Sequence, residues 1–242
     1  VVAVIGDAAI SGGMAFEALN QIGQDQTQMV IILNDNEMSI SRNVGALMHH
    51  FGELRAMNEY RDKRDFMQSQ MESAGPAARF MLEWGRNAKD SMKHFFLPER
   101  TMIFEQLGIT CSAPIDGHDI STLRHVLRTV LHTHGPTLVH VVTRKGAGYE
   151  PAMRKPETFH GIGPFDAGTG KPLSKPANAP KYMDVFGQAL VREARLDGDI
   201  VAITAAMKSG TGLSPFAAEF PHRFIDVGIT EEHAVGLASG LA

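Results

Sequence analysis

The chain has little of what extracellular, membrane or nucleic-acid-binding proteins need. It has one cysteine, Cys111, so no disulfide can form within it, and this favours a reducing compartment. It has 23 lysine and arginine residues against 27 acidic ones, which leaves no basic excess for nucleic acid. No apolar run approaches the roughly 18 residues of a membrane span. These absences predict a soluble, cytoplasmic protein that binds small molecules or anions rather than nucleic acid or membrane.

The order of apolar runs and turns predicts an α/β protein. The chain opens with a strand (1–6), a Gly-rich loop, a helix and a second strand (29–34). Neither strand alternates apolar and polar residues, which is typical of strands buried on both faces of a parallel sheet. The α/β alternation resumes after residue 100, so we expect a doubly wound parallel sheet.

Composition divides the chain into two predicted domains. Residues 166–181 belong to a stretch rich in proline and glycine, which indicates a linker. We therefore expect a first domain at 1–165 and the start of a second α/β domain at 182–242. The first residue lies in a predicted strand and the last in a predicted helix, so we expect the sequence to be a piece of a longer protein.

Polar residues follow the first two predicted strands. Asp7 comes after the first, and Asn36 after the second. Because the carboxyl ends of neighbouring parallel strands face one crevice, the Asp7 carboxylate, the Asn36 amide oxygen and a carbonyl near Met38 could together bind Mg²⁺ that holds a diphosphate. A helix beginning near Ser11 would point its amides at the same ligand.

Two other interpretations of this region are open on spacing alone. Asp7 could cap the helix, and residues 34–36 could be turn formers. The glycines at 6, 12 and 13 match neither the dinucleotide pattern GxGxxG nor the phosphate-loop pattern, so a nicotinamide-binding fold is only a weak alternative.

Several stretches, in this order, resemble the 1-deoxy-D-xylulose-5-phosphate synthases, a family of transketolase-like thiamine-diphosphate enzymes. They are GDAAISGGMAFEALN, ILNDNEMSISRNVGAL, PIDGHD, TRKGAGYEPA, TFHG, ITAAMKSGTGL and DVGITEEHAVGLASGLA. The resemblance implies a thiamine-diphosphate-binding fold in the first domain and the start of a pyrimidine-binding domain in the second. It implies thiamine diphosphate and Mg²⁺ as cofactors, and a homodimer.

The resemblance also implies roles for individual residues. Asp7, Asn36 and the Met38 carbonyl would bind Mg²⁺, and the backbone of Ala8 and Ala9, with Asn36, would face the diphosphate. Of the remaining residues, Tyr149 would contact the cofactor, Lys145 would neutralise phosphate or carboxylate charge, His160 would relay protons, and Glu231 would bind the aminopyrimidine ring and promote loss of the thiazolium proton.

For some of these residues the sequence alone leaves simpler roles open. Tyr149 could anchor a loop, Lys145 could be solvated, and His160 could be an ordinary loop histidine. Glu231 could be an acid at a helix N-terminus with Thr230 as the cap.

The implied activity is the condensation of pyruvate with glyceraldehyde 3-phosphate, with loss of CO₂, to 1-deoxy-D-xylulose 5-phosphate. We expect the 242-residue chain alone to be inactive. The alternatives are another transketolase-like enzyme or dehydrogenase E1 component, and a non-catalytic protein with the same fold. The last is suggested by Ala8 and Ala205, where the family has glycine and proline. If the backbone at residue 8 requires a positive φ, alanine would cost about 1 kcal/mol.

Overall fold

The computed structural model describes residues 1–39, 43–53, 102–173 and 179–242. The chain divides into two compact units. The first comprises Val1–Val4, Ala18–Leu33 and His49–Val142, and the second comprises Ile5–Glu17, Asn34–Met48 and Thr143–Ala242. The last residues of the first two strands, where the sequence places Asp7 and Asn36, therefore belong to the second unit.

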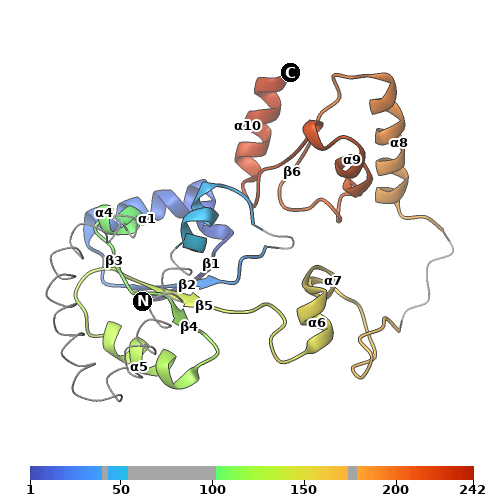
Figure 1. Cartoon of the computed structure of the whole chain (residues 1–242). Helices are drawn as coiled ribbons and strands as arrows, with labels where there is room; N and C mark the ends of the chain where they lie inside the picture. The colour runs from blue at the N-terminus through green and yellow to red at the C-terminus, as the bar shows by residue number, and fades with distance from the viewer. Residues whose placement is uncertain (40–42, 54–101, 174–178) are drawn as a thin grey trace, which may run out of the picture. The chain divides into compact units, whose positions relative to one another are not determined.

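Five strands form one sheet with the order β1-β2-β5-β3, and β4 also pairs with β5 (Figure 1). Both β3 and β4 run parallel to β5. The strands are β1 (Val2–Gly6), β2 (Val30–Asp35), β3 (Thr110–Cys111), β4 (Ile115–Asp116) and β5 (Thr137–Val142).

Both faces of β5 are covered, as expected for a doubly wound sheet. On one face Val139 and Val141 pack into a core with Val30 and with Val130 of α5 (Ile120–Val130). On the other, the His140 ring lies 5.7 Å from the ring of Phe51. The Phe51 ring in turn stacks 6.2 Å from that of Phe104, in α4 (Met102–Gln106). The predicted α/β class is confirmed, and β5 is a central strand that is buried from Thr137 to Val141. The prediction that the first strand is buried on both faces is wrong, because β1 lies at the edge of the described sheet and its Val2 and Val4 are 50% and 72% exposed.

The helices of this unit begin and pack as the local sequence dictates. Helix α5 begins after Asp119, whose carboxylate accepts from the amides of Ser121 (3.0 Å) and Thr122 (3.1 Å). Helix α1 (Gly13–Asp25) approaches the loop before β3 at Gly23. A Cβ atom at Gly23 would lie 1.7 Å from the Leu107 carbonyl oxygen, so this helix position can only be glycine. None of the described helices has the length and hydropathy needed to cross a bilayer.

The second unit carries a separate pair of parallel strands, β6 (Ala202–Thr204) and β7 (Phe224–Asp226). Its helices are η1 (Ala9–Ser11), α6 (Glu150–Arg154), α7 (Pro156–His160), α8 (Tyr182–Leu196), α9 (Ser214–Glu219), η3 (Pro221–Arg223) and α10 (Glu231–Leu241). A core of Val191, Ala194, Ala202, Leu213 and Phe216 joins α8, β6 and α9. This is the α/β start that the sequence predicts after residue 182.

The predicted linker is not irregular throughout. Up to residue 173 it forms a hydrogen-bonded turn around Asp166. The Asp166 amide donates to the Lys171 carbonyl (2.9 Å), and the Gly170 amide donates to the Asp166 carbonyl (2.7 Å). The carboxylate accepts from both the amide and the hydroxyl of Thr169, each at 2.7 Å. The domain boundaries at 165 and 182 stay predictions.

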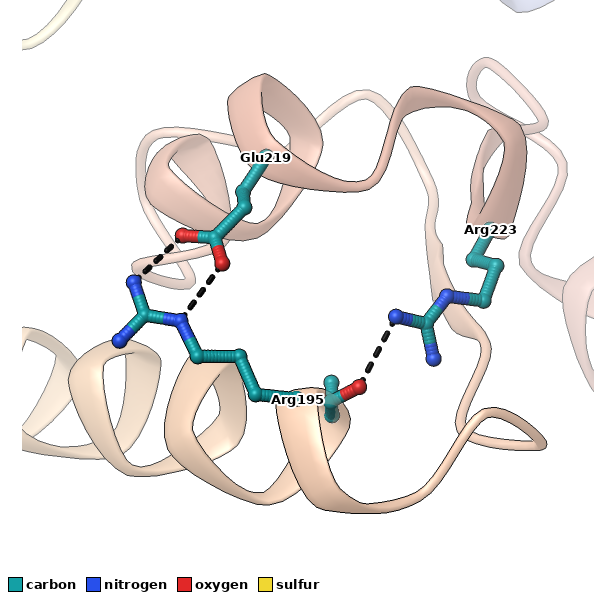
Figure 2. A network of polar contacts seen from close by, with 4 residues as sticks. Arg195, Glu219 and Arg223 are labelled. Atoms are coloured by element: carbon teal, nitrogen blue, oxygen red, sulfur yellow. Dashed lines mark hydrogen bonds and ion pairs between the residues drawn. The ribbon is translucent and has the colours of Figure 1, made fainter.

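Arg223 ties the end of α8 to the segment before β7 (Figure 2). Its guanidinium donates to the carbonyls of Ala194 (2.9 Å), Asp197 (2.9 Å) and Ile200 (3.4 Å). It also lies 4.1 Å from the centre of the Phe220 ring, a cation–π contact. One side chain thus satisfies carbonyls that the end of a helix leaves without partners.

Arg195 and Glu219 form a second link between α8 and α9, with bonds of 2.6 and 2.8 Å (Figure 2). The Arg195 side chain is 58% exposed and that of Glu219 36%, so water screens this ion pair. The hydrogen bond and charge of each partner raise the pKa of Arg195 and lower that of Glu219.

We predict that Arg223→Met lowers the free energy of unfolding by about 1–3 kcal/mol, because it leaves helix-end carbonyls without a donor. Urea denaturation measures the effect. Arg195→Met is the matched control and should cost clearly less, because its ion pair is exposed. Equal losses for the two variants would show that Arg223 has no special role.

Candidate functional site

Asp7 lies directly after β1, and a backbone hydrogen bond links it to the end of β2. The Asp7 amide donates to the Asn34 carbonyl (3.1 Å), two residues before Asn36. Since neighbouring strands lie about 4.8 Å apart, the two predicted ligands occupy adjacent strand ends. The Asp7 side chain is only 2% exposed.

The Asp7 carboxylate already has two donors. Oδ1 accepts from the Ala8 amide (2.9 Å), and Oδ2 accepts from Nδ2 of Asn43 (2.8 Å). Neither donor belongs to α1, which begins at Gly13 rather than near Ser11 because residues 9–11 form the 3₁₀ turn η1. The carboxylate is therefore held by the loops around it.

The backbone at Ala8 is ordinary for alanine. Its φ is −66° and its ψ is −34°, in the right-handed helical region. The strain that a positive φ would impose on an alanine is therefore absent at this position. Alanine in place of the family's glycine at position 8 therefore gives no conformational reason to expect weaker cofactor binding.

Burial raises the pKa of Asp7 to about 6 from its ordinary 3.8. The Ala8 amide opposes this effect, while the charge of Asp35 and a hydrogen bond with it add to the rise. Asp35 is 1% exposed, so two acidic side chains share a buried environment. A divalent cation at this point would relieve both the desolvation and the repulsion.

Residues 34–36 do not form a simple turn. Asn34 and Asp35 end β2, so the turn-former interpretation is wrong for these two. The side-chain oxygen of Asn34 accepts from the Thr143 hydroxyl (2.6 Å), and the Asp35 carbonyl accepts from the Thr143 amide (2.8 Å). For Asn36 the interpretation agrees with the structure, because its Oδ1 accepts from the Met38 amide at 3.0 Å.

The chemistry of the predicted ligands fits a hard divalent cation. The Asp7 carboxylate, the amide oxygen of Asn36 and the backbone carbonyl of Met38 are of the ligand types that Mg²⁺ prefers. No group of three His, Cys, Asp or Glu residues in the described parts of the chain could hold a metal. A metal in this region would therefore depend on amide and carbonyl oxygens as well as on Asp7.

Lys145 lies beside the same loop. Its ammonium group donates to the Ser39 carbonyl. Burial lowers the pKa of Lys145, while the charges of Asp7 and Glu157 oppose that fall. This is the one predicted catalytic residue that the structure brings close enough to Asp7 for their charges to interact.

Tyr149 is placed by aromatic packing. Its ring lies 5.7 Å from that of Phe159 and 5.9 Å from that of Phe165, which are themselves 5.2 Å apart. Its hydroxyl donates to the Ala167 carbonyl (2.9 Å). The geometry therefore favours the simpler role, an aromatic anchor for residues 149–173. His160, the exposed last residue of α7, follows Phe159 of this cluster.

Glu231 is the exposed first residue of α10. Thr230 is at the N-cap position but does not cap α10 with its side chain, because its hydroxyl donates to the Val227 carbonyl (2.7 Å). Among the described residues, no hydrogen bond or ion pair joins Glu231 or His160 to Asp7.

Asp226 organises the loop before Glu231 and was not found by sequence reasoning. Its Oδ1 accepts from the amides of Ala206 (2.9 Å) and Gly228 (3.0 Å). Ala206 has a φ of 57°, in the left-handed region that alanine rarely adopts. Strained backbone often marks functional loops, but a lone Asp at a strand end gives no such signal in sequence.

A buried carboxylate at the carboxyl edge of a parallel sheet, followed by a second pair of parallel strands, fits a transketolase-like cofactor-binding protein. The family model described as 1-deoxy-D-xylulose-5-phosphate synthase matches residues 1–143, and that of the transketolase pyrimidine-binding domain matches residues 178–242. The chain belongs to the 1-deoxy-D-xylulose-5-phosphate synthase family.

Proteins with that name are similar along the whole chain. The identity is 50% with the synthase of Desulforudis audaxviator, 49% with that of Natranaerobius thermophilus and 46% with that of Syntrophomonas wolfei. The chain covers 38%, 38% and 37% of these three proteins respectively.

We predict that Asp7→Asn makes the metal-free chain more stable at neutral pH. The pKa of Asp7 is raised in the folded chain, so a proton on Asp7 stabilises the fold. This stabilisation is fully present below about pH 4 and is lost as the pH rises through about 6. The variant avoids that loss, of the order of 2 kcal/mol. In the variant, a flip of the Asn43 amide would restore the hydrogen bond between the side chains of residues 7 and 43.

Urea denaturation in EDTA at pH 7.5 and pH 4 measures this effect. The gain should appear at pH 7.5 and vanish near pH 4. Asp25→Asn, at an exposed position, is the control. A metal-free Asp7→Asn chain that is less stable than the parent at pH 7.5 would contradict the prediction.

Proposed function

We propose that the chain is the metal- and diphosphate-binding part of a 1-deoxy-D-xylulose-5-phosphate synthase, with the start of its pyrimidine-binding domain. In a chain of the relatives' length, this enzyme would condense pyruvate with glyceraldehyde 3-phosphate, lose CO₂ and form 1-deoxy-D-xylulose 5-phosphate. It would act as a cytoplasmic homodimer. The observation that carries the proposal is the buried Asp7 carboxylate at the strand edge, in a chain of this family.

The residues around Asp7 would hold the metal and the diphosphate. Asp7, Asn36 and the Met38 carbonyl would bind Mg²⁺, and the backbone of Ala8 and Ala9, with Asn36, would face the diphosphate. The Ala8 amide donates to Asp7 in this structure, so its main effect is to orient the carboxylate.

The other predicted residues would act on the reacting groups. When bound, thiamine diphosphate supplies the nucleophile that attacks pyruvate and the electron sink that lets CO₂ leave. Lys145 would place a positive charge near the diphosphate, and Glu231 would donate a hydrogen bond to the aminopyrimidine ring. His160 would carry protons, since the pKa of a free histidine lies near neutrality. Tyr149 would contact the cofactor through its ring, because its hydroxyl is bonded to Ala167.

Two alternatives remain to be separated. A transketolase or dehydrogenase E1 component would use other donors or acceptors, and comparing pyruvate with ketose phosphates as donors tests this. A non-catalytic protein was suggested by Ala8, but the ordinary φ of Ala8 removes that conformational objection.

We predict that a full-length chain carrying these residues binds thiamine diphosphate with Mg²⁺ at micromolar concentrations. Asp7→Ala should weaken this binding tenfold or more. Loss of a residue that orients a metal ligand lowers metal affinity about 10–100-fold, and loss of the ligand itself should cost at least as much. Isothermal titration calorimetry gives the affinity.

Asp25→Ala, at an exposed position of α1, is the matched control and should bind like the parent. Absence of cofactor binding by the parent would favour the non-catalytic alternative. Equal binding by the parent and Asp7→Ala would overturn the proposed metal site.

A further inference from the structure

Asn43, which lies outside the predicted set of ligands, connects Asp7 to the loop after β2. Its side-chain Nδ2 donates to Oδ2 of Asp7 at 2.8 Å, and its backbone amide donates to the Glu37 carbonyl at 3.1 Å. Asn36 and Met38, the other predicted metal ligands, flank Glu37. Asn43 therefore contacts both Asp7 and the loop that carries Asn36 and Met38.

The orientation of the Asn43 amide is determined by Asp7. An ionised carboxylate only accepts hydrogen bonds, so the NH₂ group must face it and Oδ1 must face away. Oδ1 is buried and has no hydrogen-bond partner among the described residues. A buried carbonyl oxygen without a hydrogen-bond donor is unfavourable. Rotating the amide would not relieve this, because the rotation would place that oxygen against the Asp7 carboxylate.

The two donors hold the Asp7 carboxylate from both oxygens. Asn43 binds Oδ2 and the Ala8 amide binds Oδ1. The carboxylate plane is thus fixed before any cation arrives. Groups that orient a metal ligand in this way affect metal affinity almost as strongly as the ligands themselves.

We propose that Asn43 is a positioning residue for the metal site: its hydrogen bond to Asp7 Oδ2 fixes the carboxylate for Mg²⁺, and its backbone bond to Glu37 fixes the loop that carries Asn36 and Met38. This rests on the proposed function, because it needs a cation at Asp7. Asn43 would act on the cation through Asp7, because its NH₂ group donates to that carboxylate.

The test is the affinity of the full-length chain for Mn²⁺, a paramagnetic substitute for Mg²⁺, measured by electron paramagnetic resonance with thiamine diphosphate present. Asn43→Leu keeps the branched shape but has no donor, and Asn43→Ala removes the same donor without adding bulk. Each should weaken Mn²⁺ binding by about 10–100-fold and alter the spectrum of the bound ion. Asn43→Gln, which keeps an amide donor, should recover part of the affinity.

Thermal melts in EDTA separate positioning from a merely structural role. A structural role would lower the melting temperature of the Asn43 variants and leave the Mn²⁺ affinity of the folded protein unchanged. That result, in whichever of the Leu and Ala variants melts cooperatively, would overturn the inference. Asn20→Leu, on the exposed side of α1, controls for the change in side-chain type. A parent chain that binds no Mn²⁺ would refute the proposed function instead, before any variant is compared.

Discussion

The arrangement of the candidate site depends on the burial of one carboxylate. Asp7 follows β1 in a place where its side chain is buried, and Asp35 lies close enough to add to the rise in its pKa. A fold that only had to be stable would place a neutral side chain there. Retaining two acidic groups at the carboxyl edge of a parallel sheet is understandable if a cation compensates them.

The loops around this edge are organised by polar contacts rather than by an apolar core. Thr143 donates to Asn34 and Asp35, Lys145 to Ser39, and Asn43 to Asp7 and Glu37. Apart from the bond between Asn43 and Glu37, each contact joins segments that lie far apart in the sequence. The sheet thus provides a rigid edge, and these hydrogen bonds set the directions of the oxygens at that edge.

The elements and the Asp7–Asn36 pair could be predicted because their signals are local. The unbroken apolar run at 29–34 marks β2 as a mostly buried strand, and polar residues at strand ends follow from strand order. The equally apolar β1 has exposed valines because it lies at the edge of the described sheet, a position that its own residues do not encode. The parts that could not be predicted depend on loop conformation. The contact of Asn43 with Asp7, the negative φ of Ala8 and the positive φ of Ala206 each depend on how a loop folds back. The sequence also predicts a helix with a stripe of core residues at Phe80, Trp84, Ala88, Met92 and Phe95, and these positions lie outside the described residues.

The strand pair β6 and β7 uses an aspartate in a related way at its own edge. There Asp226, at the end of β7, accepts two backbone amides and holds Ala206 in a left-handed conformation. After β1 the buried carboxylate of Asp7 has a raised pKa, whereas at β7 one oxygen of Asp226 is occupied by two loop amides. The same residue type would therefore serve two purposes: Asp7 would bind a cation, as proposed above, and Asp226 shapes the loop from which Glu231 begins α10.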